Sequence, residues 1–347
     1  MKHVSPAAKF IHHVLHQECE SLRGRWTQAL GAAPQDQVEG IRGFRRAVKK
    51  IRCALLLTAG GLCAQKREAL DKRWAALARR LGTFRDLDAR EKKIKYIIAG
   101  VPAMHQEAAW LAWNMVYGAA VDAHNGAKVG AAVDAISGAK SGAAVDANNG
   151  AKSGAAVDAI SGAKSVEPVD AMSGPNRHEV LQGMSCDMEH ILCDTEKIKF
   201  PHLTPEMVAG SIEHLWNRAR AQADKSWVDR DEAWLHSLRK RVQRTHIAFR
   251  LVREHSGERG VQLEKRFDAA AKAMGELRDI SMIRLVLPTH TQAMDPARHS
   301  LALEFLHAHI AQTESQAAMH ARQLVEKAFK PTIEKTLRHI ALHIHAL

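Results

Sequence analysis

Two segments far apart in the 347-residue chain align without gaps, and they constrain the fold more than any other feature. The segment DKRWAALARRLGTFRDLDA covers residues 71–89, and EKRFDAAAKAMGELRDISM covers residues 264–282. Both contain a Gly-x-x-Arg-Asp signature, at residues 82–86 and 275–279. An internal repeat of this length is typical of a fold built from two related units, so we expect two similar halves.

Apolar residues recur at helical spacing through most of the chain, and no segment has the persuasive alternation that a half-buried strand requires. Hydrophobic residues make up 46% of the sequence and aromatic residues only 5%, and the periodic segments are rich in good helix formers. We therefore predict an all-α fold of two antiparallel four-helix bundles related by a pseudo-twofold axis. The predicted halves cover residues 1–200 and 201–347.

The periodicity and the positions of glycine and proline predict the individual helices. They cover residues 6–30, 37–58, 66–98 with a break near Gly82, 103–117, 177–199, 205–223, 232–254, 260–287, 296–313, and 315–343 with an interruption at Pro331. We interpret the two signatures as corners, in which the glycine permits a new helix start or a close approach of helices. The Arg-Asp pair would then stabilise each corner by capping and ion pairing.

A twelve-residue repeat interrupts the first half, beginning with VDAHNGAKVGAA at Val121. Each unit has aspartate at its second position and glycine at its sixth, but it lacks the several oxygen ligands of a calcium loop. Small residues and glycines bury too little apolar surface to offset chain entropy. We therefore predict a flexible low-complexity insertion over residues 118–176, with a short β-solenoid as the alternative.

The chain is strongly basic, with a net charge of +12 and a pI near 9.6. Such self-repulsion is accepted more readily by a protein that binds a polyanion, so a phosphate polymer, a nucleic acid or an anionic membrane is the expected class of partner. No stretch of about 18 apolar residues could span a bilayer, and the five cysteines have no CxxC spacing. We predict a cytoplasmic protein with reduced thiols.

The first basic helix is IRGFRRAVKKIRCALLL, residues 41–57. At about 100° per residue, its cations share one face and Phe44, Val48 and Ile51 form the opposite, buried stripe. The cations of this face are Arg42, Arg45, Arg46, Lys49, Lys50 and Arg52. No acid interrupts the run from Arg42 to Arg52, so we expect these cations to lack the helical acid partners of an ordinary solvated face.

The second basic helix is LHSLRKRVQRTHIAFRLV, residues 235–252. Counting from His236, its polar residues repeat the spacing that the first helix shows when counted from Arg42. The residues at matching positions are Arg239, Gln243, Arg244 and His246. We therefore expect the two helices to occupy equivalent places in the two halves.

At these residues the sequence resembles the CHAD family, whose name refers to a histidine-containing α-helical domain. The family pattern is His-x-x-Arg-x-x-x-Arg-Arg-x-Arg on a basic helix, followed by Leu-Gly-x-x-Arg-Asp-x-Asp, with both motifs repeated. This sequence departs from the pattern at Arg42, which replaces the histidine, at Gln243 and His246, which replace arginines, and at Ser281, which replaces the last aspartate.

The resemblance implies binding of inorganic polyphosphate in a basic cleft or pore, and association with polyphosphate granules. A linear polymer with about one charge per phosphate suits a track of arginine and lysine side chains. The predicted binding residues are Arg42, Arg45, Arg46, Lys49, Lys50, Arg52, Arg85, His236, Arg239, Lys240, Arg244, His246 and Arg278.

Three alternatives stay open at this point. A metal-dependent polyphosphate phosphohydrolase would need carboxylates to hold Mg²⁺, and the recurrent ones are Asp86, Asp88 and Asp279. A nucleic-acid-binding helical protein is disfavoured by the scarcity of aromatic residues on the basic faces. A metal could bind at histidines spaced i,i+4, such as His12 and His16, but no HExxH motif is present. We predict a non-enzymatic binding protein with no cofactor, no metal and no membrane partner.

Overall fold

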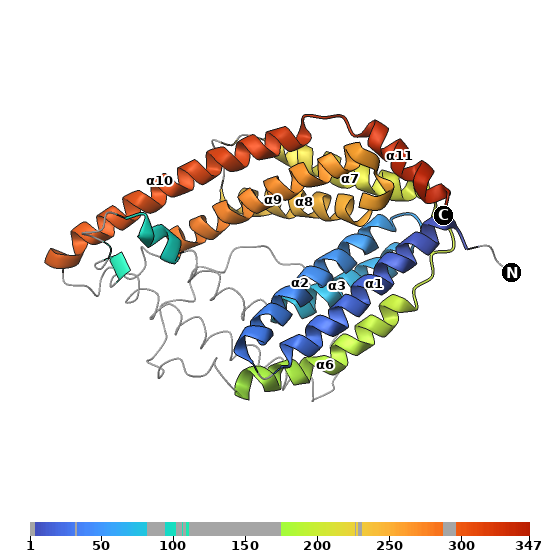
Figure 1. The fold of residues 1–347 in the computed structure, drawn as a ribbon, viewed down its shortest axis with the longest axis horizontal. Helices are drawn as coiled ribbons and strands as arrows, with labels where there is room; N and C mark the ends of the chain where they lie inside the picture. Colours follow the sequence, from blue (N-terminus) through green and yellow to red (C-terminus); the bar gives the residue numbers. More distant parts are fainter. Residues whose placement is uncertain are drawn as a thin grey trace, which may run out of the picture.

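A computed structural model describes residues 4–31, 33–81, 94–101, 106, 109–110, 175–225, 227, 231–286 and 296–347. Throughout these residues the regular structure is helical, with no named strand (Figure 1). The all-α prediction is therefore confirmed. The twelve-residue repeats lie outside the described residues, and the pseudo-twofold relation stays a prediction.

Four helices form the bundle drawn in blue and green in Figure 1: α1 (Pro6–Ala29), α2 (Pro34–Leu57), α3 (Ala64–Arg80) and α6 (Pro175–Glu196). Ser5 caps α1, because its hydroxyl accepts a hydrogen bond from the backbone N–H of Ala8. Apolar side chains of these helices meet in the centre, where the rings of Trp26 and Phe44 lie 5.0 Å apart. The apolar stripe predicted for the first basic helix is buried.

Five helices form the second bundle: α7 (Pro205–Ala223), α8 (Glu232–Leu251), α9 (Gly257–Val286), α10 (Pro296–Phe329) and α11 (Glu334–His345). A cluster of three phenylalanines joins α8, α9 and α10: the ring of Phe267 stacks on that of Phe249 at 5.7 Å and meets that of Phe329 edge to face at 5.0 Å. The α2 helix packs against α8, so the two bundles share one continuous apolar core.

A second, smaller core lies at the far end of the long α9–α10 pair. Residues 94–101 contribute Ile94, Ile97, Ile98 and Val101, which pack against α9 and α10 through apolar side chains. Figure 1 shows this short teal helical segment beside the two long helices and away from α1, α2 and α3. Residues from both predicted halves therefore share this core.

The structure corrects one interpretation and one predicted helix boundary, although α9 itself was predicted as one helix over residues 260–287. The second signature, residues 275–279, lies inside the continuous helix α9, so the prediction of a corner is wrong for this copy. The first signature lies outside the described residues. Likewise, α10 runs without a break through residues 313–315, where we predicted two helices, and the chain bends only around Pro331.

The α1 and α2 helices approach each other closely at Gly40. A Cβ atom at this position would lie 2.6 Å from the Cα atom of Ala29, inside the backbone of the neighbouring helix. We expect Gly40→Ala to destabilise the protein by about 2–3 kcal/mol, because the two helices would have to separate. Gly24→Ala, on an open face of α1, should instead stabilise it by about 0.5–1 kcal/mol through helix propensity. Urea unfolding of both variants measures the difference, and equal effects would contradict the close approach.

No helix within the described ranges is long and apolar enough to cross a membrane.

Candidate anion-binding site

The two basic helices meet where the bundles join. The α2 and α8 helices pack directly against each other, and the buried Cys53 thiol on α2 donates a hydrogen bond to the backbone carbonyl of Arg244 on α8, at an S–O distance of 3.5 Å. Burial raises the pKa of the Cys53 thiol to about 12, so the thiol keeps its proton. This contact fixes the cationic part of α8 beside the end of α2.

Five cationic side chains and one histidine from three helices gather at this junction, and we call them the cation cluster. They are Arg52 from α2, His236, Arg239, Lys240 and Arg244 from α8, and Arg278 from α9. Burial lowers the pKa of Lys240, and four arginines of the cluster lower it further, in the order Arg244, Arg278, Arg52 and Arg239. Lys240 therefore interacts electrostatically with all four arginines of the cluster.

The second half supplies the part of the cluster that is least neutralised by acids. Lys240 and Arg244 are exposed and Arg278 is half-buried. Within the described part of the chain, none of these three side chains forms an ion pair. Like charges this close repel each other at an effective dielectric constant near 20. The surface is therefore suited to an anion that can contact several cations at once.

The α9 helix lies alongside Arg239 at Gly275. A Cβ atom at Gly275 would be 3.9 Å from Nε and 4.0 Å from Nη2 of Arg239. The glycine thus leaves a narrow space next to the guanidinium, although an alanine would also fit at this distance. One turn further along α9, Arg278 joins the same cluster. In the second half, the repeated signature therefore contributes Arg278 to the cluster, and its Gly275 leaves space for Arg239.

Three of the six predicted cations of α2, namely Arg42, Lys50 and Arg52, pair with acids. Nε and Nη2 of Arg52 donate to the two carboxylate oxygens of Asp71 on α3 at 2.7 and 2.9 Å. Lys50 pairs with Glu18 on α1 at 2.7 Å. The basic run has no acid of its own, but α1 and α3 provide acids across the helix interfaces. Arg52 and Lys50 thus pair with acids of neighbouring helices, which a pattern within α2 does not address. The expectation that no acid of the same helix is a partner is wrong for Arg42, which pairs with Glu39.

The remaining predicted residues of α2 lie in different surroundings. Arg42 pairs with Glu39 at 2.8 Å, one turn earlier on the same helix. Nη1 of Arg45 donates to the backbone carbonyl of Leu81 at 3.3 Å, and so holds the end of α3. Arg46 is exposed, Lys49 is half-buried, and Lys50 lies about 200° around the helix from Arg52. Of the predicted α2 set, the structure brings Arg52 into the cation cluster.

His246 has a different environment from the other predicted residues of α8. It is buried, and its Nε2 atom lies 3.2 Å from Oε1 of Glu264 and 3.6 Å from Oδ1 of Asp268, both on α9. These contacts connect α8 to α9 in the interior of the second bundle. The two carboxylate neighbours of His246 disfavour an anion there, so we do not assign His246 to the cation cluster.

The aligned positions of the two halves make the same kind of contact. Arg52 and His246 stand at matching positions of the basic helices, and Asp71 and Glu264 begin the two aligned segments. In each half the basic residue pairs with the acid of the following helix. Sequence reasoning aligned these residues but did not predict their pairing. The signal was present in the alignment.

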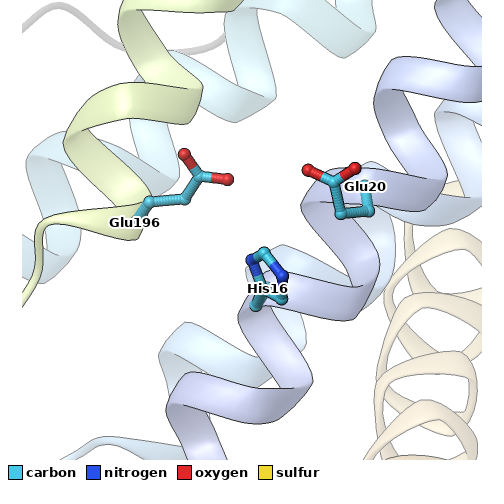
Figure 2. Close-up of side chains that lie close together, drawn as sticks. All are labelled: His16, Glu20 and Glu196. Carbon is cyan, nitrogen blue, oxygen red and sulfur yellow. The ribbon is translucent and has the colours of Figure 1, made fainter.

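A group that could hold a metal lies elsewhere, between α1 and α6. Figure 2 shows His16 and Glu20 on α1 and Glu196 at the end of α6, with side chains turned toward one another, and their candidate ligand atoms lie within 4.8 Å. Arg23 already occupies both carboxylates, at 2.5 Å from Glu20 and at 2.8 and 3.0 Å from Glu196. Through a hydrogen bond and its charge, Arg23 lowers the pKa of the Glu196 carboxyl. A divalent cation would have to displace this guanidinium, so the group acts as an ion-pair network between the two helices.

Arg85, and the carboxylates of Asp86 and Asp88 that the phosphohydrolase alternative requires, lie outside the described residues. Asp279 is half-buried on α9, directly after Arg278 of the cation cluster. The predictions that the protein has no catalytic residue and no metal stay untested.

Comparisons with known proteins give a match to a family. The CHAD domain family model matches residues 14–155, a range that includes all of α2 and α3 and ends before α6. Among solved structures, the chain is similar to the crystal structure of the CHAD domain from the plant Ricinus communis, with 16% sequence identity and a TM-score of 0.48. That similarity covers 100% of this chain and 94% of the plant domain. No curated protein matches the chain.

Proposed function

We propose that the chain binds inorganic polyphosphate, on the basis of the match of residues 14–155 to the CHAD domain family model and of the cation cluster. The observation that carries the proposal is the convergence of Arg52, Lys240 and Arg278, with their neighbours, from α2, α8 and α9. Binding is non-enzymatic in this proposal. In the cell it would bring the protein to cytoplasmic polyphosphate granules.

The chemistry of the cluster favours a flexible phosphate polymer over a single phosphate. The permanently charged residues come from different helices, so successive phosphates of one polymer can contact successive cations. Arginine can also grip two phosphate oxygens at once through its planar guanidinium. Each contact relieves repulsion within the cluster and releases counterions from the polymer.

The two bundles contribute unequally in this proposal. Arg52 is held by Asp71 in a two-point ion pair, so it must share its guanidinium between the carboxylate and a phosphate. Lys240 and Arg244 have no such competitor within the described residues. We therefore assign the main contacts to α8 and α9, and a supporting contact to α2.

Binding titrations against salt provide the test. With five permanent cations and about 0.7 counterions released per phosphate contact, as for single-stranded nucleic acids, log K should fall with log salt at a slope of about −3 to −4. Affinity for long-chain polyphosphate should then drop about 100-fold between 50 and 200 mM salt. A slope near zero would contradict the proposal.

Competition and turnover assays distinguish the alternatives. We expect polyphosphate to displace labelled RNA or DNA, since nucleic acids carry their charges at wider spacing and the cluster contains no tryptophan, tyrosine or phenylalanine for base stacking. Equal competition by RNA would favour the nucleic-acid alternative. Release of phosphate from the polymer in the presence of Mg²⁺ would favour the phosphohydrolase alternative.

A further inference from the structure

His236 differs from the other members of the cation cluster, because it is the one whose charge can change near neutral pH. It lies in the first turns of α8 and is half-buried. Its Nδ1 atom is enclosed and has no hydrogen-bond partner among the described residues. Among the described residues, the charges that shift the pKa of this side chain are the cations Lys240, Arg278 and Arg239.

The charges around His236 come from each side of the cluster. Arg239 and Lys240 follow it on α8, and Arg278 faces it from α9. From α2, Arg52 acts on Lys240 in the same cluster. The α7 helix, which also packs against α8, brings Arg218 to Arg241 on the adjoining side. Of these cationic groups, Lys240, Arg278 and Arg239 act on His236 itself and disfavour a proton on the imidazole.

Two physical effects keep the imidazole neutral in the absence of an anion. Burial removes the imidazolium from water, and Lys240, Arg278 and Arg239 repel it. Together they lower the pKa of His236 to about 4. The imidazolium would carry N–H groups on both ring nitrogens, and the enclosed Nδ1 has no acceptor among the described residues. A phosphate group in the cluster offsets the repulsion, because its negative charge lies beside the same cations.

We propose that polyphosphate binds to the cation cluster together with one proton, which is taken up from solvent by the imidazole of His236. This inference rests on the proposed function and adds a regulation of the same site. In the free protein His236 is neutral, and in the complex it adds one positive charge to the cluster. Acidification then strengthens binding without any change of fold.

The sign and the size of the effect follow from linkage. At a pH above the pKa that His236 has in the complex, its imidazole is neutral in both the free and the bound protein. The affinity then does not depend on the pH through this group. Between that pKa and the free value of about 4, affinity rises as pH falls, by at most tenfold per pH unit. We expect His236 to account for at least a tenfold gain in affinity between pH 7.5 and pH 5.5.

The chain has 21 histidines, and two variants test whether the pH dependence of binding comes from His236. His236→Asn removes the titrating group, and His320→Asn removes an exposed histidine of α10 as the matched control. Affinity for long-chain polyphosphate is measured from pH 5.5 to 7.5 at constant ionic strength. The gain at low pH should shrink at least tenfold in His236→Asn and persist in His320→Asn. Equal pH dependence in all three proteins would overturn the inference.

Proton uptake by the wild-type protein provides a second readout that does not depend on how well the variants fold. Calorimetric titration at pH 6 in two buffers with different ionisation enthalpies gives the number of protons bound with the polymer. We expect a value close to one, and a value close to zero would overturn the inference while leaving the proposed function intact. Absence of polyphosphate binding at every pH would instead overturn the proposed function.

Discussion

The double variant Lys240→Glu/Arg244→Glu is expected to bind long-chain polyphosphate at least about 100-fold more weakly than the wild type at 100 mM salt. The two substitutions remove two phosphate contacts and place two carboxylates in the cluster, so both the counterion release and the attraction are reduced. Both side chains are exposed, so the fold should tolerate the change. The salt dependence should also become shallower, by about 1.4 in slope.

A matched control distinguishes the local cluster from overall charge. The double variant Arg250→Glu/Lys330→Glu changes the net charge equally, at exposed positions near the end of α8 and after α10. We expect its affinity to stay within about threefold of the wild type, since distant exposed charges are screened at this salt concentration. If both double variants lost the same affinity, the assignment of the polyphosphate site to the cation cluster would be wrong. Helical circular dichroism confirms that both proteins are folded.

The helices that carry the cluster could be predicted from the sequence. The second basic helix was predicted over residues 232–254 and is observed over Glu232–Leu251, because apolar residues such as Leu238 and Val242 recur at the helical period and are buried. The first was predicted over residues 37–58 and is observed over Pro34–Leu57. Periodicity reports which face of a helix is buried, so it also predicted which face carries the cations.

The pairing of those cations could not be predicted by considering each helix alone. Asp71 is 19 positions from Arg52 and lies on a different helix, and Glu18 reaches Lys50 from α1. Such pairs depend on how helices pack, which periodicity within one helix does not encode. The internal alignment contained a clue, since Asp71 and Glu264 occupy the same aligned position and each pairs with the basic helix of its half.

The second signature shows why a glycine is a weak guide to a helix boundary. Gly275 costs a helix about 1 kcal/mol relative to alanine, and we therefore predicted a corner at this type of motif. The adjoining side chains Met274, Leu277 and Ile280 are all buried on α9, and this packing outweighs the cost. Likewise, the packing of residues 94–101 on α9 and α10 depends on tertiary contacts that no local pattern reveals.

Phe267→Ala is expected to lower the free energy of unfolding by about 3–5 kcal/mol, the usual cost of removing a buried phenylalanine ring. Phe267 is fully buried and touches Phe249 on α8 and Phe329 on α10, so its loss leaves a cavity where three helices meet. Phe267→Leu fills most of that volume and should cost about 1–2 kcal/mol. Urea unfolding measures both values, and similar costs for the two variants would contradict the central position of the ring.

The same variant tests whether fold and site are separate. Phe267 lies about three turns along α9 from Arg278, and the cation cluster draws on α2 and α8 as well as α9. While most molecules remain folded, Phe267→Ala should therefore bind polyphosphate within about threefold of the wild type, because exposed cations govern the affinity. Lys240→Glu/Arg244→Glu should show the reverse pattern, with weak binding and nearly unchanged unfolding. If both variants lost stability and affinity together, binding would depend on the packing of the second bundle as much as on its charges.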